Sequence, residues 1–171
     1  MSDLLGSCLI FIRKLEESGI RYVIVGGVAV NLYGYSRFTG DIDIIISLSK
    51  ANLEKFDKLM HKLGYIERQP VHIKELGNSK KLKEFIDKKG LKAFTFVSAK
   101  KPLLDIDIIV QESMDFQDYY ERKNIVRVWG IALPVCHIDD LIDMKKTVSR
   151  DKDLLDIEAL LKLKSLGSAQ I

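Results

Sequence analysis

The sequence contains few cysteines and no long apolar run, the features typical of disulfide-rich, zinc-binding or membrane-spanning proteins. It has two cysteines, Cys8 and Cys136, and neither belongs to a CxxC or Cys/His metal-binding pattern. Both stand in apolar runs, so we predict buried thiols in a reducing, cytoplasmic environment. The N-terminus lacks a basic region followed by an apolar stretch, which argues against a signal peptide. No apolar run approaches the ~20 residues of a transmembrane helix, so no membrane association is expected.

Aromatic residues and net charge are also scarce. Aromatic side chains make up 8% of the chain, there is one Trp, and the net charge is +3. That charge is too small to indicate a nucleic-acid-binding protein by itself. Apolar residues nevertheless reach 47%, which is enough for a hydrophobic core and argues against global disorder. A length of 171 residues fits one domain spanning residues 1–171.

The basic side chains show no metal-binding or nucleic-acid-binding motif. Lysines gather in residues 74–92, which we interpret as a solvated surface segment; the alternative is a collar for phosphate-bearing substrates. The histidines at 61, 72 and 137 are isolated in the sequence and lack metal-ligand spacing, so we interpret each as a structural or surface residue.

Hydrophobic periodicity predicts helices mixed with a sheet. Helical spacing covers residues 3–18, 50–63, 138–148 and 151–164, with Asp151 as the N-cap of the last helix. Short β-branched or apolar runs predict strands over residues 21–25, 41–47, 65–68, 91–98, 103–110, 124–128 and 131–135. Strands 91–98 and 103–110 are close enough to form a hairpin. The predicted fold class is α/β (α+β), with a mixed sheet flanked by helices, and residues 76–90 receive no assignment.

Two acidic residues interrupt the isoleucine-rich strand at residues 41–47. Residues two apart in a strand point to the same face, so Asp41 and Asp43 project together. Carboxylates about 7 Å apart on one face repel each other unless a cation lies between them. Mg²⁺ prefers carboxylate oxygens together with water and phosphate, so it is the expected ion.

The same pattern recurs in the strand at residues 103–110, where Asp105 and Asp107 share one face. Aspartate is disfavoured in strands and costly to bury, so two such pairs in one small domain are hard to explain by packing. The alternative is that each pair lies at a solvent-exposed strand edge, neutralised by Lys or Arg.

A diglycine follows the first predicted strand. Gly26-Gly27 opens a short helix over residues 28–33, and the Asp-x-Asp strand comes soon afterwards. Glycines let the backbone approach a ligand closely, and a helix N-terminus offers free N–H groups to phosphate. The motif alone is weak, because many strand–helix turns contain glycine without a ligand.

The order of these motifs resembles a known family. The stretch from Gly26 to Gly34, followed by Arg37-Phe38-Thr39-Gly40-Asp41-Ile42-Asp43, resembles the signature of nucleotidyltransferases of the DNA polymerase β superfamily. The closer resemblance is to the small AbiEii-like group, which residues 138–161 also resemble. Gly27 stands where the wider superfamily commonly has serine.

The resemblance implies transfer of an NMP from an NTP, with ATP expected, to a hydroxyl of a protein, an RNA or a small molecule. It implies two Mg²⁺ ions, held by Asp41, Asp43 and a third carboxylate from a neighbouring strand. Asp107 fits the family's Asp-then-apolar pattern better than Asp105, which is the alternative third ligand. The backbone of the diglycine would then bind phosphate.

Further basic residues are candidates for the nucleotide site. Arg37 either clamps phosphate in a bidentate manner or pairs with an aspartate to offset its repulsion. Lys145 and Arg150, on the late helices, either reach the site or lie on a solvated helix face. Thr39 is expected to bond to the local loop backbone.

Two other functions remain open at this stage. One is a degenerate module that binds nucleotide without turnover. The other is a toxin–antitoxin or defence subunit that depends on a protein partner, which the short chain favours because little of it remains for binding an acceptor. The sequence assigns no oligomeric state.

Overall fold

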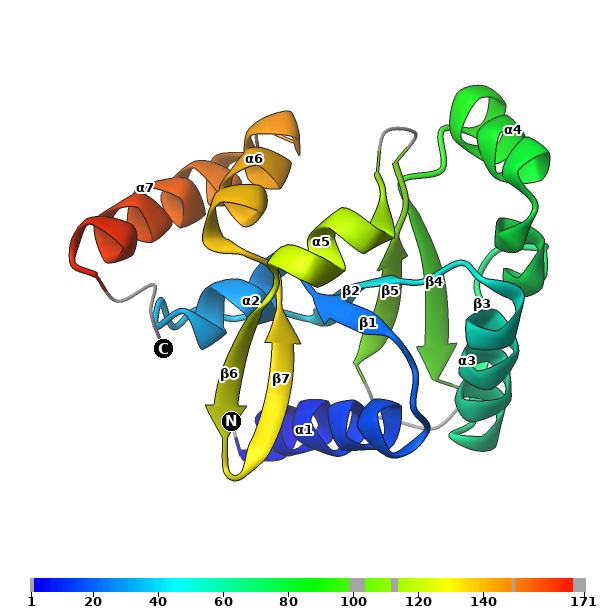
Figure 1. The fold of residues 1–171 in the computed structure, drawn as a ribbon, viewed down its shortest axis with the longest axis horizontal. Helices are drawn as coiled ribbons and strands as arrows, with labels where there is room; N and C mark the ends of the chain where they lie inside the picture. Colours follow the sequence, from blue (N-terminus) through cyan, green and yellow to red (C-terminus); the bar gives the residue numbers. More distant parts are fainter. Residues whose placement is uncertain (1, 99–103, 112–113, 149, 168–171) are drawn as a thin grey trace.

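The computed structural model describes residues 2–98, 104–111, 114–148 and 150–167, in a mixed arrangement of helices and strands (Figure 1). The helices are α1 (Ser2–Glu17), α2 (Gly26–Leu32), α3 (Lys50–Lys62), η1 (Ile73–Gly77), α4 (Ser79–Lys89), α5 (Phe116–Arg122), α6 (Ile138–Val148) and α7 (Asp151–Ser165). The strands are β1 (Tyr22–Ile24), β2 (Asp41–Ile46), β3 (Tyr65–Glu67), β4 (Ala93–Ser98), β5 (Asp105–Ile109), β6 (Asn124–Val128) and β7 (Ile131–Val135).

The strands form one seven-stranded sheet in the order β3-β4-β5-β2-β1-β7-β6. Strands β2 and β5 are parallel, as are β1 and β7, and the remaining neighbours are antiparallel. The predicted mixed sheet is therefore confirmed. Strands β4 and β5 pair antiparallel as a hairpin would, although residues 99–103 between them lie outside the described part of the chain. Trp129 and Gly130 join β6 to β7 with φ of 48° and 78°, which two-residue hairpin turns require.

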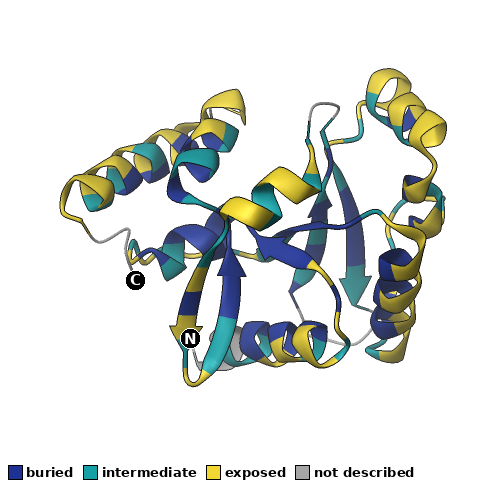
Figure 2. Cartoon of the chain, in the orientation of Figure 1, coloured by how far each residue is buried: buried dark blue, intermediate teal, exposed yellow. Residues whose placement is uncertain are grey.

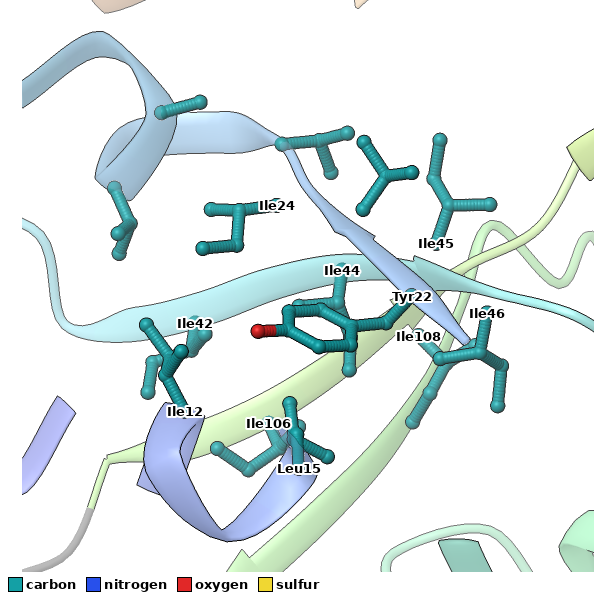
Figure 3. Packing of buried hydrophobic residues seen from close by; sticks show 14 of the residues in the cluster. Ile12, Leu15, Tyr22, Ile24, Ile42, Ile44, Ile45, Ile46, Ile106 and Ile108 are labelled. Atoms are coloured by element: carbon teal, nitrogen blue, oxygen red, sulfur yellow. The ribbon is translucent and has the colours of Figure 1, made fainter. Parts of the chain in front are cut away.

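One face of the sheet carries a large part of the hydrophobic core. Ile42 and Ile44 of β2 lie in register with Ile106 and Ile108 of β5, and all four are buried. Helix α1 covers this face, and Figure 3 shows its Leu15 beside Ile106. Strict alternation along each strand then places the intervening aspartates on the opposite face.

Helix α3 covers the same core face farther along the sheet. Phe56 meets Phe96 of β4 edge-on, with ring centroids 5.8 Å apart, and both rings are buried. The central strands are mostly buried, while α4 and α7 present mainly exposed residues (Figure 2). Within the described residues, no helix combines the length and the hydropathy needed to cross a membrane.

Several local predictions need adjustment. The unassigned segment 76–90 forms the end of η1 and helix α4, whose apolar residues are too few for a clear periodic signal. Its lysines are exposed, as the surface interpretation expected. Helix α2 begins at Gly26, before the predicted start. The N-cap of α7 is Arg150, and the predicted cap Asp151 is the first helical residue. Cys8 and Cys136 are buried free thiols.

Candidate active site

The parallel pairing of β2 and β5 gathers the aspartates on one face of the sheet. Asp41 lies opposite Asp105, and Asp43 lies opposite Asp107. Thr95 of β4 lies opposite Asp107 on the other side. Because paired residues in neighbouring strands share a face, these side chains all project away from the core.

Three of these carboxylates converge. One oxygen from each of Asp41, Asp43 and Asp107 lies within 4.8 Å of the other two. The Oδ1 atom of Asp107 is buried and has no hydrogen-bond partner among the residues that the structure describes. A buried carboxylate oxygen without a partner is costly, and a cation would satisfy it. The chemistry of the donor set, all carboxylate oxygen, suits Mg²⁺.

Asp105 stands apart from this cluster. Its carboxylate pairs with Arg68, which follows β3, at 2.5 Å, and its side chain is 37% exposed. The edge-neutralised alternative considered for both pairs therefore describes Asp105, and it does not describe the three converging residues. This difference favours Asp107 as the third ligand.

The pKa shifts of the clustered carboxylates are those expected at a site that binds a cation. Burial, together with the charges of Asp41 and Asp107, raises the pKa of Asp43 to about 6. Burial also raises the pKa of Asp107, with Asp41 adding to the effect. The backbone N–H of Gly27 and the charge of Lys145 act in the opposite direction on the pKa of Asp43. Close carboxylates in a poorly solvated place are typical of functional sites.

The diglycine is required by the approach of α2 to the acids. Gly26 has a φ of 61°, and a Cβ there would lie 1.9 Å from Oδ2 of Asp43. A Cβ on Gly27 would lie 2.5 Å from Oγ1 of Thr39. The Asp43 carboxylate and the Thr39 hydroxyl therefore occupy the space in which a side chain at Gly26 or Gly27 would lie. The serine common in the wider superfamily has no space at position 27 in this arrangement.

The loop before β2 is held by side chains on both sides. The Asn31 side chain accepts from the backbone N–H of Arg37 and donates to its carbonyl. The Thr39 hydroxyl lies 3.0 Å from Oδ1 of Asp41 and 3.3 Å from its carbonyl oxygen. The local backbone role expected for Thr39 is thus present, and the hydroxyl also touches a cluster carboxylate.

A buried ionic network joins this loop to the last two helices. Asp156 of α7 is fully buried and accepts two hydrogen bonds from Arg37, Nε to Oδ1 at 2.7 Å and a terminal guanidinium N–H to Oδ2 at 2.8 Å. Lys145 of α6 lies 2.6 Å from the same Oδ2 and 3.4 Å from Asp153. Arg37 does pair with an aspartate, but that aspartate is Asp156 and not a member of the cluster. Lys145 is buried rather than on a solvated face.

Arg150 also lies near the acids. Its Nε donates to Asp153 at 2.8 Å, and this hydrogen bond, together with the charges of Asp43 and Asp41, raises the pKa of the Arg150 guanidinium. We call the group of Arg37, Lys145, Arg150, Asp153 and Asp156 the wall. Its two buried acids, Asp153 and Asp156, each contact two of its basic side chains. Sequence reasoning missed the roles of Asp153 and Asp156. The signal was available, because two acids three residues apart in a helix share a face.

The comparison with family models decides the affiliation. Residues 10–171 match the model described as "Nucleotidyl transferase AbiEii toxin, Type IV TA system". The chain belongs to the AbiEii nucleotidyltransferase family. Among curated proteins no match was found.

Solved structures share the fold of this AbiEii-family chain. The lincosamide antibiotic adenylyltransferase LnuA, bound to lincomycin, aligns with a TM-score of 0.61 and 14% identity over 92% of this chain and 96% of its own. The antibiotic-resistance factor ANT(2'')-Ia gives 0.60 and 12% over 98% and 85%. An antigenic nucleotidyltransferase-like protein from Paracoccidioides brasiliensis gives 0.59 and 16% over 96% and 77%. At these identities the likeness shows the nucleotidyltransferase fold alone.

Proposed function

We propose that this chain is a metal-dependent nucleotidyltransferase that moves an NMP from an NTP to a hydroxyl group on a protein, an RNA or a small molecule. The observation that carries the proposal is the convergence of Asp41, Asp43 and Asp107 beside the diglycine. ATP is the nucleotide we expect, and the shared fold of LnuA, an adenylyltransferase, supports that expectation.

The three carboxylates are the proposed Mg²⁺ ligands. The unpartnered Oδ1 of Asp107 fits this role, and so do the raised pKa values of Asp43 and Asp107: burial and the neighbouring carboxylates disfavour the charged form, which a bound cation would stabilise. When bound, Mg²⁺ would neutralise the phosphates and increase the acidity of the acceptor hydroxyl. The aspartates would hold the reacting groups in place, since they project from two paired strands of a rigid sheet.

The basic residues of the wall would provide positive potential for the triphosphate. Lys145 is close enough to Asp43 to lower the pKa of that carboxyl, so its ammonium group acts at the cluster. Asp156 fixes the positions of both Lys145 and Arg37. The backbone N–H of Gly27 is bonded to Asp43, so Gly27 would position that carboxylate, and phosphate would approach the chain at Gly26.

The test is Mg²⁺-dependent incorporation of labelled NMP, measured with each of the four NTPs and with cell extract as the source of acceptors. We expect incorporation by the wild type and none above background by the Asp41→Asn, Asp43→Asn double variant. Asp87→Asn is the matched control, because Asp87 is an exposed acid on α4. Nucleotide binding without incorporation by the wild type would favour the degenerate binding module instead.

A partner-dependent toxin–antitoxin subunit is the second candidate, and the family description favours it. Leucines of α7 are also exposed, with Leu154 and Leu155 each at 58% and Leu161 at 51%. Exposed apolar side chains on one helix are available to a protein partner. Growth arrest on expression, relieved by a neighbouring gene product, would support this candidate. A native mass equal to one chain in every extract would argue against an obligate partner.

A further inference from the structure

A second group of ionisable side chains lies on the other face of the sheet, where α3, β3 and η1 meet (Figure 1). Asp57 and His61 stand four residues apart on α3 and therefore share one side of the helix. Glu67 of β3 lies opposite Phe96, so it projects to the core face and toward α3. His72 precedes η1. Folding thus joins two histidines that are isolated in the sequence.

The distances between donor atoms in this group suit a small cation. One ligand atom from each of Asp57, His61 and Glu67 lies within 4.8 Å of the other two. Nε2 of His61, the ring nitrogen that would bind the metal, is 3.4 Å from Oε2 of Glu67. Ligands about 2.0–2.1 Å from a tetrahedral zinc ion lie about 3.4 Å from one another.

Two buried oxygen atoms of the group make no hydrogen bond within the described part of the chain. One is Oδ1 of Asp57, a residue that is only 8% exposed, and the other is Oε1 of Glu67. Lys74 occupies the other oxygen of Asp57 at 2.8 Å, whereas Oδ1 faces the histidine rings, with Nδ1 of His61 3.1 Å away but without hydrogen-bond geometry. Buried carboxylate oxygens in this state are satisfied by a bound cation or by protonated neighbours.

The histidine orientation also fits metal ligation. Nδ1 of His61 lies 2.9 Å from the carbonyl oxygen of Asp57, which leaves the lone pair of Nε2 directed toward Glu67. Metal-bound histidines commonly donate their other ring N–H to a carbonyl in this way. The His72 ring stacks on His61 and has a different role: its Nδ1 accepts a hydrogen bond from the backbone N–H of Lys74, so its Nε2 carries the proton and faces Oδ1 of Asp57 at 3.5 Å and Oε1 of Glu67 at 3.8 Å.

We propose that Asp57, His61 and Glu67 bind a divalent transition metal, with Zn²⁺ the best fit, and that the Nε2–H of His72 supports the two carboxylate ligands. The imidazole ligand distinguishes this site from the all-carboxylate cluster, because nitrogen ligands favour Zn²⁺ over Mg²⁺. The site is separate from the proposed catalytic centre and does not depend on it.

Such a metal would link the edge strand β3 to helix α3, which packs over it. Glu67 belongs to β3, the edge of the sheet, and Asp57 and His61 belong to α3. The residue after Glu67 is Arg68, whose side chain reaches the opposite face and pairs with Asp105. A metal at Glu67 would therefore also stabilise the segment that holds Arg68 beside the candidate active site.

The experiment is a zinc titration of metal-free protein in competition with a chromophoric chelator. The Asp41→Asn, Asp43→Asn double variant serves as the background, so that the catalytic cluster contributes no metal binding. We expect one Zn²⁺ per chain and an increase in melting temperature on its addition. Adding His61→Gln to this background should raise the Kd by at least about 100-fold, since a lost direct ligand costs more than a lost supporting contact.

The matched control is His137→Gln, which removes a histidine outside the group and should leave the Kd unchanged. Glu67→Gln preserves side-chain shape and should weaken binding by at least about tenfold, which keeps the test decisive if the His61 variant folds poorly. Absence of stoichiometric Zn²⁺ binding by the folded background would overturn the proposal. Equal Kd values for the His61, Glu67 and His137 variants would do the same, and would leave Lys74 and protonated histidines as the counter-charge.

Discussion

Strands β2 and β5 carry the same five residues, Asp-Ile-Asp-Ile-Ile, and lie parallel in register, yet their acids differ in surroundings. Both acids of β2 belong to the carboxylate cluster. Of the two acids of β5, Asp107 belongs to the cluster and Asp105 forms an ion pair with Arg68. The isoleucines that follow the aspartates are alike in burial, since Ile42, Ile44, Ile106 and Ile108 are all buried. Local sequence therefore determines which face each side chain occupies, and neighbouring elements determine what it does there.

The largest expected effect separates the two acids of β5. Asp107→Asn should reduce NMP transfer by at least about 1,000-fold, because a ligand that positions the metal is lost. Asp105→Asn should reduce it by less than about tenfold, because Asp105 lies outside the cluster in a partly exposed ion pair with Arg68. Initial rates at saturating Mg²⁺ and NTP measure both. A larger loss with Asp105→Asn would reverse the choice of third ligand.

The next effect concerns the network that encloses the β2 acids. Asp156→Asn should lower the free energy of unfolding by about 3–5 kcal/mol, because Arg37 and buried Lys145 lose their shared counter-charge. Asp143→Asn is the matched control: its side chain is 72% exposed in a surface ion pair, so the change should stay within about 0.5 kcal/mol. Urea unfolding measures the difference. Equal stability of the two variants would show that the network contributes little.

A third comparison isolates the contact between α2 and Asp43. Gly26 and Gly90 have nearly the same positive φ, 61° and 63°, but a Cβ meets Asp43 only at Gly26. Gly90→Ala should therefore cost about 1–2 kcal/mol of unfolding free energy for its backbone conformation alone. Gly26→Ala should cost about 1–3 kcal/mol more, because the carboxylate must move. Thermal unfolding of both variants decides it, and identical losses would mean that Asp43 moves away freely.

The smallest expected effect is a dependence of stability on pH. Asp43 has a folded-state pKa of about 6, above its ordinary value of 3.8, so between these values the folded protein binds more protons than the unfolded chain. Stability of the metal-free protein should therefore fall as pH rises through this window, by on the order of 1–2 kcal/mol from this residue. Unfolding in chelator at pH 5 and pH 7.5 should show a smaller fall for Asp43→Asn than for wild type. If Asp43→Asn left the dependence of unfolding free energy on pH unchanged, a group other than Asp43 would be responsible for it.

Much of the site could be predicted from the sequence because its signals are local. Alternation along residues 41–47 and 103–110 predicted the shared face of the aspartates, and glycine spacing predicted the turn before α2. The choice between Asp105 and Asp107 could not follow from alternation, since both occupy one face. It depends on Arg68, which lies 37 residues from Asp105 in sequence.

The missed features depend on contacts between distant residues. Arg37 and Asp156 are 119 residues apart, and no local pattern links them. His61 and His72 come together only because the chain turns through β3 between them. Helix α4 was missed for another reason: its few apolar residues, Leu82, Phe85 and Ile86, give too weak a period within a lysine-rich segment.

The most direct test of the proposed metal-binding cluster is calorimetric binding of NTP in the presence and absence of Mg²⁺. Wild type should bind Mg·NTP with an affinity that requires the metal, and the Asp41→Asn, Asp43→Asn double variant should bind at least about tenfold more weakly and without metal dependence. Binding of Mg·NTP by the double variant as tightly as by wild type would contradict the assignment of these carboxylates.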